Sequence, residues 1–300
     1  MKVYTPSYYN KFECKKGGCA HSCCIDWEID IDDKTKEKYK NVSGEFGKKL
    51  KKEIENGHFL MDENKRCPFL NKNNLCDIYI NLGKDALCQI CSDHPRFTNV
   101  FEDREEIGLG LSCEACVDII LEEKEKTKFE PKIEPKNEQV ENEFFTLRQK
   151  IFDILQNRRE TVQNRIKTLI KEFDVTIPEK STDEWAEFLL SLEILSDDWK
   201  NLLENLKENE NFSFLSEEKW QIALEQLIVY FVYRYVKPYD LSVSHYLAFC
   251  IVNFNLILEI FKKSNDLSFD SFKNIVRMYS AEIEYSPQNT EDLMFEIQFS

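Results

Sequence analysis

The sequence contains few of the residues that build common nucleotide-binding folds. It has 8 glycines among 300 residues, and the best candidate for a glycine-rich turn, Gly108 and Gly110, leads directly into Ser112 and Cys113. A Rossmann-type fold needs such a turn between a strand and a helix, so this composition argues against that fold. Histidine is scarcer still, with 4 residues, which leaves little imidazole for binding a metal.

The sequence also lacks a net positive charge, a signal sequence and a segment compatible with lipid. The formal net charge is −15, so we expect no nucleic acid as a partner, because such binding depends on clustered lysine and arginine. The first residues lack the apolar stretch of a secretory signal, so we expect a cytoplasmic location and reduced thiols. The longest apolar run, residues 241–261, includes Ser242, Asn253 and Glu259. We therefore expect a buried core helix there and no transmembrane segment.

Cysteine is abundant and unevenly distributed. Ten of the 11 cysteines lie between Cys14 and Cys116, while Cys250 stands alone inside the apolar run, where a thiol behaves as a small hydrophobe. A stretch rich in charge and proline, residues 122–143, follows the last clustered cysteine and is typical of a solvated linker. We therefore predict a cysteine-rich domain over residues 1–121, a linker over 122–143 and a helical domain over 144–300.

Hydrophobic periodicity predicts a mainly α fold whose second half is all helical. Apolar residues from Phe144 to Phe173 recur at separations of three, four or seven, as on one helix face. Ser181 and Glu184 predict a capping box at the next helix. Further helices are expected over 217–236, 241–262 and 269–284, which gives five or six in all and no strand. We expect the dense aromatic residues here, Tyr230 and Tyr235 among them, to pack in the core.

The first half is irregular by pattern. Short alternating segments at 25–32 and 104–112 are candidate strands, and residues 33–57 are consistent with one or two helices broken at Gly44 and Gly47. A domain with so little continuous apolar surface needs another source of stability. We expect an irregular metal-binding domain with a few short strands.

The cysteine spacings indicate that sulfur binds a metal. Two residues separate Cys88 from Cys91 and Cys113 from Cys116, a spacing that lets both thiolates point into one turn and bind one ion or cluster edge. Such a thiolate-rich set favours zinc, copper(I) or an iron–sulfur cluster. The candidate metal ligands are Cys14, Cys19, Cys23, Cys24, Cys67, Cys76, Cys88, Cys91, Cys113 and Cys116.

Several interpretations of these thiols remain open at this point. Neighbouring side chains diverge, so at most one of Cys23 and Cys24 easily joins a given centre. Cys88, Cys91 and His94 make a plausible zinc set. From spacing alone, structural zinc is the common explanation for paired cysteines in an intracellular protein. A redox-sensing dithiol is a third option, although it needs only two thiols.

Three segments together resemble a known family. They are FECKKGGCAHSCCIDWEIDID (12–32), CPFLNKNNLCDIYINLGKDALCQICSDHPR (67–96) and GLGLSCEAC (108–116), and they look like the amino-terminal half of the flagellin lysine-N-methylase family. SAEIEYSPQN (280–289) resembles that family's Ile-Glu-His-Ser stretch. The resemblance is strong to about residue 116 and weak thereafter.

The resemblance implies an enzyme that uses S-adenosylmethionine to methylate surface lysines of flagellin in the cytosol, with a [4Fe-4S] cluster held by the cysteines. All ten candidate ligands except Cys116 match the family's positions. Trp27 and Arg96 lie in the best-matched segments, so we expect Trp27 to shield the cluster and Arg96 to pair with the cofactor's carboxylate or a nearby acid. The alternative is a zinc- or iron–sulfur-binding structural protein without methyltransferase activity.

Two departures from the family pattern concern titratable residues. His94 stands where the family usually has tyrosine, and Tyr285 replaces an expected histidine. A lysine ammonium, with a pKa of about 10.4, must lose its proton before it can attack a methyl group, so a nearby carboxylate or phenol is expected. Glu284 and Tyr285 are the candidate catalytic residues, and Glu28, Asp30 and Asp32 are further acidic candidates.

A radical mechanism lacks its usual sequence pattern. Radical S-adenosylmethionine enzymes show Cys-x3-Cys-x2-Cys, and Cys19 and Cys23 begin such a spacing. The next cysteine, Cys24, follows immediately instead of three positions later. If methyl transfer occurs, a cluster assists it through another arrangement.

Overall fold

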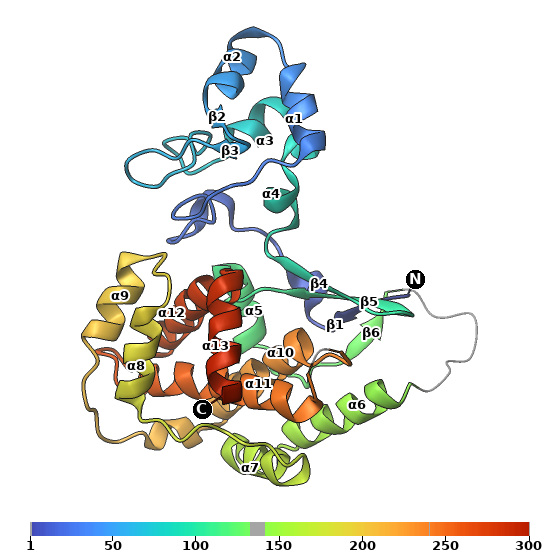
Figure 1. The fold of residues 1–300 in the computed structure, drawn as a ribbon, viewed down its shortest axis with the longest axis vertical. Coiled ribbons are helices and arrows are strands. Elements are labelled where there is room, and N and C mark those ends of the chain that lie inside the picture. Colours follow the sequence, from blue (N-terminus) through green and yellow to red (C-terminus); the bar gives the residue numbers. More distant parts are fainter. Residues whose placement is uncertain (1, 133–141, 240, 300) are drawn as a thin grey trace. The chain divides into compact units, whose positions relative to one another are not determined.

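The computed structural model describes residues 2–132, 142–239 and 241–299 and divides the chain into two compact units. We call Glu13–Arg96 the cysteine-rich unit, and Met1–Phe12 together with Phe97–Ser300 the helical unit. The first unit is therefore an insertion between two segments of the second. Helices dominate both units, which is consistent with the predicted mainly α fold (Figure 1).

These units have other bounds than the predicted domains. Residues 97–121, expected with the cysteines, pack in the helical unit because Leu109, Leu111 and Ile120 are buried in its core. Part of the predicted linker is also packed there, since Glu123 and Thr127 are buried. Residues 133–141 of that linker lie outside the described residues.

The cysteine-rich unit is built from short elements. Its core contains Ile29, Leu50 and Phe69, all buried. The segment 25–32, expected as a strand, forms only isolated bridges, from Ile25 to Arg66 and from Asp30 to His58. The elements are α1 (Asp33–Lys40), α2 (Gly44–Lys52), α3 (Asp77–Leu82), α4 (Gln89–Asp93) and the two-stranded sheet of β2 (Ile54–Glu55) with β3 (His58–Phe59).

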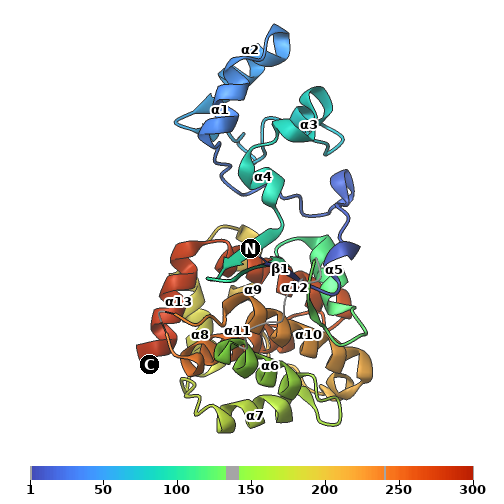
Figure 2. The same cartoon turned by 90° about the vertical axis from the view of Figure 1, so that its right-hand side faces the viewer.

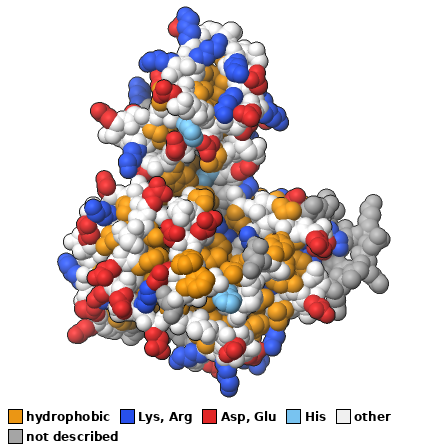
Figure 3. All heavy atoms as spheres, in the orientation of Figure 1, with side chains coloured by type: hydrophobic (Ala, Val, Ile, Leu, Met, Phe, Trp, Pro, Cys, Tyr) orange, Lys and Arg blue, Asp and Glu red, His pale blue; other side chains and the backbone are white. Residues whose placement is uncertain are grey.

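Residues 33–57, where one or two helices were expected, form two, but the break lies before the glycines rather than at them. Residues 41–43 separate α1 from α2, and both Gly44 and Gly47 lie inside α2. Gly44 begins the helix with a φ of +76°, a conformation that a residue with a Cβ rarely adopts. Lysine side chains of α2 contribute to the blue surface at the top of Figure 3.

A four-stranded mixed sheet belongs to the helical unit. Its order is β4 (Arg96–Val100), β5 (Arg104–Leu109), β1 (Lys2–Pro6) and β6 (Phe129–Pro131). β1 pairs with β5 in parallel and with β6 antiparallel. The expected strand at 104–112 is therefore present as β5.

The remaining helices form the core of the helical unit. The apolar stripe of 144–173 is divided between two helices, α6 and α7, and the described residues after 142 contain eight α-helices where five or six were expected. The helices are α5 (Glu114–Leu121), α6 (Glu143–Leu155), α7 (Val162–Glu172), α8 (Thr182–Ser191), α9 (Asp197–Glu204), α10 (Glu218–Tyr235), α11 (Val243–Lys262), α12 (Phe269–Tyr279) and α13 (Pro287–Phe299), with a π-helix at Ser280–Glu284.

The central helices α10 and α11 pack side by side (Figures 1 and 2). α11 is long and apolar enough to cross a membrane by length and composition, yet most of it is buried inside this unit. Asn253 lies fully buried in it and accepts a hydrogen bond from the Tyr279 hydroxyl at 2.8 Å. This burial is that of a core helix, as the interrupted apolar run indicated.

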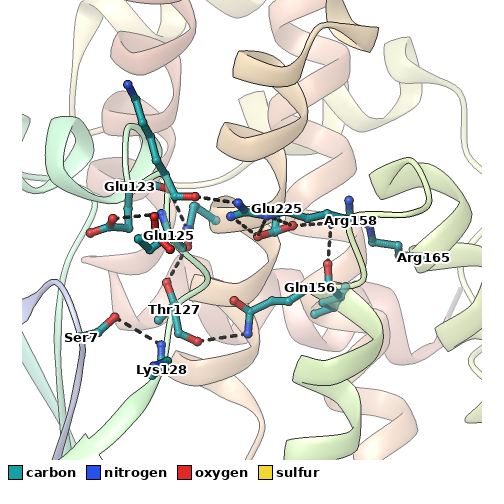
Figure 4. Close-up of polar contacts among 12 residues, drawn as sticks. Ser7, Glu123, Glu125, Thr127, Lys128, Gln156, Arg158, Arg165 and Glu225 are labelled. Carbon is teal, nitrogen blue, oxygen red and sulfur yellow. Dashed lines mark hydrogen bonds and ion pairs between the residues drawn. The ribbon is translucent and has the colours of Figure 1, made fainter.

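A buried ion network fixes the segment after α5 to the helices (Figure 4). The Glu225 carboxylate of α10 accepts three hydrogen bonds from Arg158, at 2.8, 2.9 and 3.1 Å, and pairs with Arg165. Arg158 also donates to the main-chain oxygen of Lys124 at 2.6 Å. Gln156 donates to the main-chain oxygen of Thr127 at 3.1 Å. These bonds satisfy polar groups that the packed helices remove from water.

Candidate functional site

Five thiols converge in the core of the cysteine-rich unit. Cys67 and Cys88 are buried there, and Cys24, Cys76 and Cys91 pack against the same apolar cluster. The N–H of Cys67 donates to the carbonyl oxygen of Cys24 at 2.9 Å, and the Sγ atoms of Cys88 and Cys91 are 3.3 Å apart. All five are free thiols. Segments far apart in the sequence therefore bring sulfur to one place.

The pKa values of these thiols reflect burial and mutual proximity. Burial raises the pKa of Cys67 to about 12, and the nearby Cys24, Cys76 and Cys88 also raise it. A hydrogen bond with Cys23 is the largest of the effects that lower the pKa of Cys24 to about 7. Metal ligation takes cysteine as the thiolate, so a bound cation would favour deprotonation of the whole set.

Asp32 holds the helix that carries Cys91 and begins after Cys88. It is the N-cap of α1, where its Oδ1 accepts from the Thr35 N–H at 2.9 Å, and its Oδ2 accepts from the Gln89 N–H at 2.8 Å. Cys88 is the N-cap residue of α4 and Cys91 lies within that helix. The bond from Gln89 is the main reason that the pKa of Asp32 falls to about 2. The Asp32 carboxylate thus bonds the first turn of both α1 and α4.

The donor set fits a thiolate-bound metal centre. Five sulfur atoms exceed the four that a tetrahedral zinc ion or a four-iron cluster takes from a protein. As they stand, no three Cys, His, Asp or Glu side chains lie close enough to hold an ion within residues 2–132, 142–239 and 241–299. The fit therefore rests on the kind and number of donors in one core.

The other predicted ligands lie outside that apolar cluster, although the Cys23 side chain is hydrogen-bonded to Cys24. Cys14 and Cys23 are exposed and Cys19 is half-buried. In the helical unit, Cys113 is the N-cap residue of α5 and Cys116 is buried in the core. The choice of ligands among the ten cysteines stays a prediction.

Trp27 and Arg96, predicted to bind a cofactor, lie in different surroundings. The half-buried Trp27 meets the His94 ring edge to face, with 5.3 Å between ring centres, and it lines a hollow of about 410 Å³. Arg96 is exposed at the start of β4. A second hollow of about 470 Å³ also belongs to the cysteine-rich unit, and Asn56 and His58 line both. The acidic side chains in the two hollows are Asp26, Glu28, Glu55, Asp30 and Asp32.

The predicted catalytic residues lie in a polar cluster of the helical unit. The side chain of Glu284 is fully buried, and both carboxylate oxygens accept from the Tyr230 hydroxyl at 3.0 Å. The Tyr235 hydroxyl donates to the same carboxylate at 3.0 Å, and Arg234 Nε lies 3.3 Å from it. Tyr285 follows directly and is half-buried. We call Tyr230, Arg234, Tyr235, Glu284 and Tyr285 the Glu284 cluster.

Burial keeps the phenols of this cluster protonated. It raises the pKa of Tyr230 and Tyr235 well above the ordinary value, although the charge of Arg234 opposes the shift. Burial also raises the pKa of Tyr285, again opposed by Arg234. Tyr230 and Tyr235 therefore act as hydroxyl donors to the carboxylate.

Tyr230 and Tyr235 pack in or against the core as expected, but pattern gave no sign of their bonds to Glu284. Arg234 received no role. The available signal was an arginine between tyrosines near the end of an apolar helix. Its partner could not be foreseen, because Glu284 is 50 residues away in the sequence.

Comparison with known proteins connects this unit with lysine methylation. A family model described as the FliB lysine N-methylase C-terminal domain matches residues 107–300. The lysine-N-methylase of Salmonella typhimurium is 28% identical over 133 residues, which cover 40% of this chain and 33% of that protein. The flagellar biosynthetic protein FliU of Salmonella muenchen shows 28% identity over 133 residues, covering 40% of this chain and 78% of FliU. No solved structure matches.

Proposed function

The chain belongs to the FliB lysine N-methylase family, and on that basis we propose that it methylates lysine ε-amino groups of a flagellar protein, with flagellin as the substrate. Family membership confirms the resemblance inferred from the cysteine motifs. The chain spans about a third of the Salmonella lysine-N-methylase that it matches. The activity, its cofactors and its partner are therefore parts of the proposal.

The Glu284 cluster is the observation that best supports this function. It places a carboxylate, phenols and an arginine together inside the segment that the family model matches. We assign the role of proton acceptor to Glu284, and Tyr285 forms a half-buried side of the site next to it. Removal of the proton leaves the lysine nitrogen with a lone pair for the new N–C bond.

S-adenosylmethionine is the proposed methyl donor and would supply an activated methyl group on a positively charged sulfur. Transfer of that methyl group to the lysine nitrogen would leave the electron pair of the broken carbon–sulfur bond on the donor's sulfur. The negative charge of a buried carboxylate stabilises the positively charged proton that the amine releases. The exposed Arg96 stays a candidate partner for the donor's carboxylate.

The cysteine-rich unit is proposed to hold the [4Fe-4S] cluster, with zinc as the alternative metal. Cys24, Cys67, Cys76, Cys88 and Cys91 are the thiols from which we expect its ligands, since they share one core. Trp27 would limit access of solvent from its side. We propose a cytoplasmic location, where these thiols stay reduced.

Methyl transfer is tested with protein purified without oxygen and flagellin from the same cell. Mass spectrometry should show methylated lysines only when S-adenosylmethionine is added. Glu284→Gln should lower kcat by about 100-fold, the range of a lost general base. Glu282→Gln is the matched control, because Glu282 is buried in the same π-helix and accepts from the Leu195 N–H at 2.8 Å.

The outcome separates the two candidate functions. Methylated flagellin together with stoichiometric iron and sulfide supports the enzyme. Stoichiometric zinc without methyl transfer supports the structural metal protein. Equal losses of activity in Glu284→Gln and Glu282→Gln would contradict the role given to Glu284.

A further inference from the structure

The π-helix brings an unusual backbone to the Glu284 cluster. Ser280–Glu284 lies between α12 and α13, and four of its five residues, Glu282 and Glu284 among them, are buried. A π turn inserts an extra residue into a helix, forms rarely and is frequent at functional sites. It changes the direction in which the following side chains point. The position of Glu284 and Tyr285 therefore depends on how this turn is held.

Arg234 contacts this turn at several atoms. Its Nη2 donates to the main-chain oxygen of Glu284 at 3.1 Å, and its Nη1 donates to the Tyr230 hydroxyl at 2.8 Å. Its Nε lies 3.3 Å from the Glu284 carboxylate. The guanidinium carbon is 5.3 Å from the centre of the Tyr285 ring, within the range of a cation–π contact. One planar cation thus fixes both candidate catalytic side chains and the backbone between them.

The arginine is itself held in place. It belongs to the last turn of α10, where the Asn99 side chain donates to the main-chain oxygens of Tyr233 and Arg234 at 3.3 and 3.0 Å. The Phe97 ring lies on the guanidinium, 4.8 Å from its carbon atom. The arginine side chain is 12% exposed, whereas the Glu284 side chain is 0% exposed. Of this ion pair, the carboxylate is therefore the more deeply buried partner.

Two other buried arginine–glutamate pairs provide a comparison. Arg148 pairs with Glu106 and Arg165 pairs with Glu225, and these four side chains are at most 4% exposed. Arg148 donates to the oxygen of Val236, and Arg165 to those of Leu155 and Glu160. The bonds of these arginines are to groups outside the π-helix, so the pairs serve as internal references for a structural guanidinium.

We infer that Arg234 is the positioning residue of the methylation site, holding the Glu284 carboxylate and the Tyr285 ring in the geometry that accepts the lysine amine. The inference rests on the proposed function. Arg234 acts through its two neighbours. The planar guanidinium fork is needed because a single group must contact the Glu284 carbonyl oxygen, the Tyr230 hydroxyl and the Glu284 carboxylate at the same time. A lysine would keep the charge and lose the fork.

The test compares Arg234→Lys with Arg165→Lys. The second variant replaces a buried guanidinium that is not part of the Glu284 cluster. Melting temperature, kcat and KM for flagellin are measured for each at saturating S-adenosylmethionine. Arg234→Lys should lower kcat by about 100-fold with KM within about threefold, because small misplacements of catalytic groups have effects of that size. Arg165→Lys should lower the melting temperature and leave kcat within about threefold. A normal kcat in Arg234→Lys would overturn the inference.

A second measurement does not depend on activity. Hydrogen exchange of the protein without substrates should show faster exchange at residues 280–285 in Arg234→Met than in Arg165→Met, because Arg234 bonds the π-helix whereas Arg165 bonds Glu225, Leu155 and Glu160. Added guanidinium should slow that exchange again and restore at least about tenfold of the lost kcat. Unchanged exchange at 280–285 would overturn the inference while leaving the proposed function intact. Lack of methyl transfer by the wild-type protein would overturn both.

Discussion

The two units surround their functional side chains with different structural elements. In the helical unit, long helices bury Glu225, Glu106 and Glu284, and each carboxylate meets an arginine. In the cysteine-rich unit, helices of five to nine residues surround a small apolar core that contains sulfur. A large core can orient buried charges by itself. A small core with short helices needs another constraint, which in our proposal is a metal bound by the thiols.

Metal removal should have the largest effect and should separate the two units. If the converging thiols bind the metal, its loss removes a contribution on the order of 10 kcal/mol from the cysteine-rich unit. Chelation under reducing conditions should expose residues 13–96 to proteolysis and leave the helical unit protected. Mass spectrometry of the fragments checks this.

Cysteine variants sharpen the same comparison. Cys67→Ser should lose most of the bound metal, whereas Cys250→Ser should retain it, because Cys250 is a buried core residue of α11. Elemental analysis gives the metal content of each. Full metal content in Cys67→Ser would remove that residue from the ligand set.

Within the helical unit, loss of a buried carboxylate should have the next largest effect. Glu225→Ala leaves two arginines, Arg158 and Arg165, without their partner, so we expect about 3–5 kcal/mol of destabilisation. Urea unfolding measures the change. The exposed Glu187→Ala, in α8, is the control and should stay within about 0.5 kcal/mol of the wild type. Equal values for both would contradict a structural role for the ion network.

Acid should act first on the cysteine-rich unit. The pKa of Asp32 is about 2 in the folded unit, below its ordinary value of 3.8. Its contribution to stability is therefore complete above about pH 4 and is lost as the pH falls towards 2. Unfolding followed by near-ultraviolet circular dichroism between these values should show a transition that Asp32→Asn shifts or removes. An identical acid transition in the variant would exclude Asp32 as its source.

The smallest expected effect is at an exposed helix start. Ser181→Ala removes the side chain that accepts from the Glu184 N–H at 3.2 Å, so it should cost about 1 kcal/mol. Thermal unfolding measures this value. Ser191→Ala, at the other end of α8, tests whether the effect belongs to the cap.

Local chemistry was predictable from the sequence, and long-range packing was not. The Ser181–Glu184 capping box forms as predicted, since its bonds join residues three positions apart. The π-helix could not be foreseen, because the apolar spacing of 269–284 fits an uninterrupted α-helix as well. Thiol spacing indicated a sulfur cluster, but the role of Asp32 depends on the fold that brings Gln89 to it.

The position of the cysteine-rich unit within the chain has a consequence for its folding. It is inserted between β1 and β4, and β1 pairs in parallel with β5, the neighbour of β4. The pairing of these strands confines the insertion as a closed loop, which lowers the entropy that its chain loses on folding. If the thiols bind a metal, a protein stripped of it would thus keep the loop tethered to the folded strands, and reloading would need only local refolding.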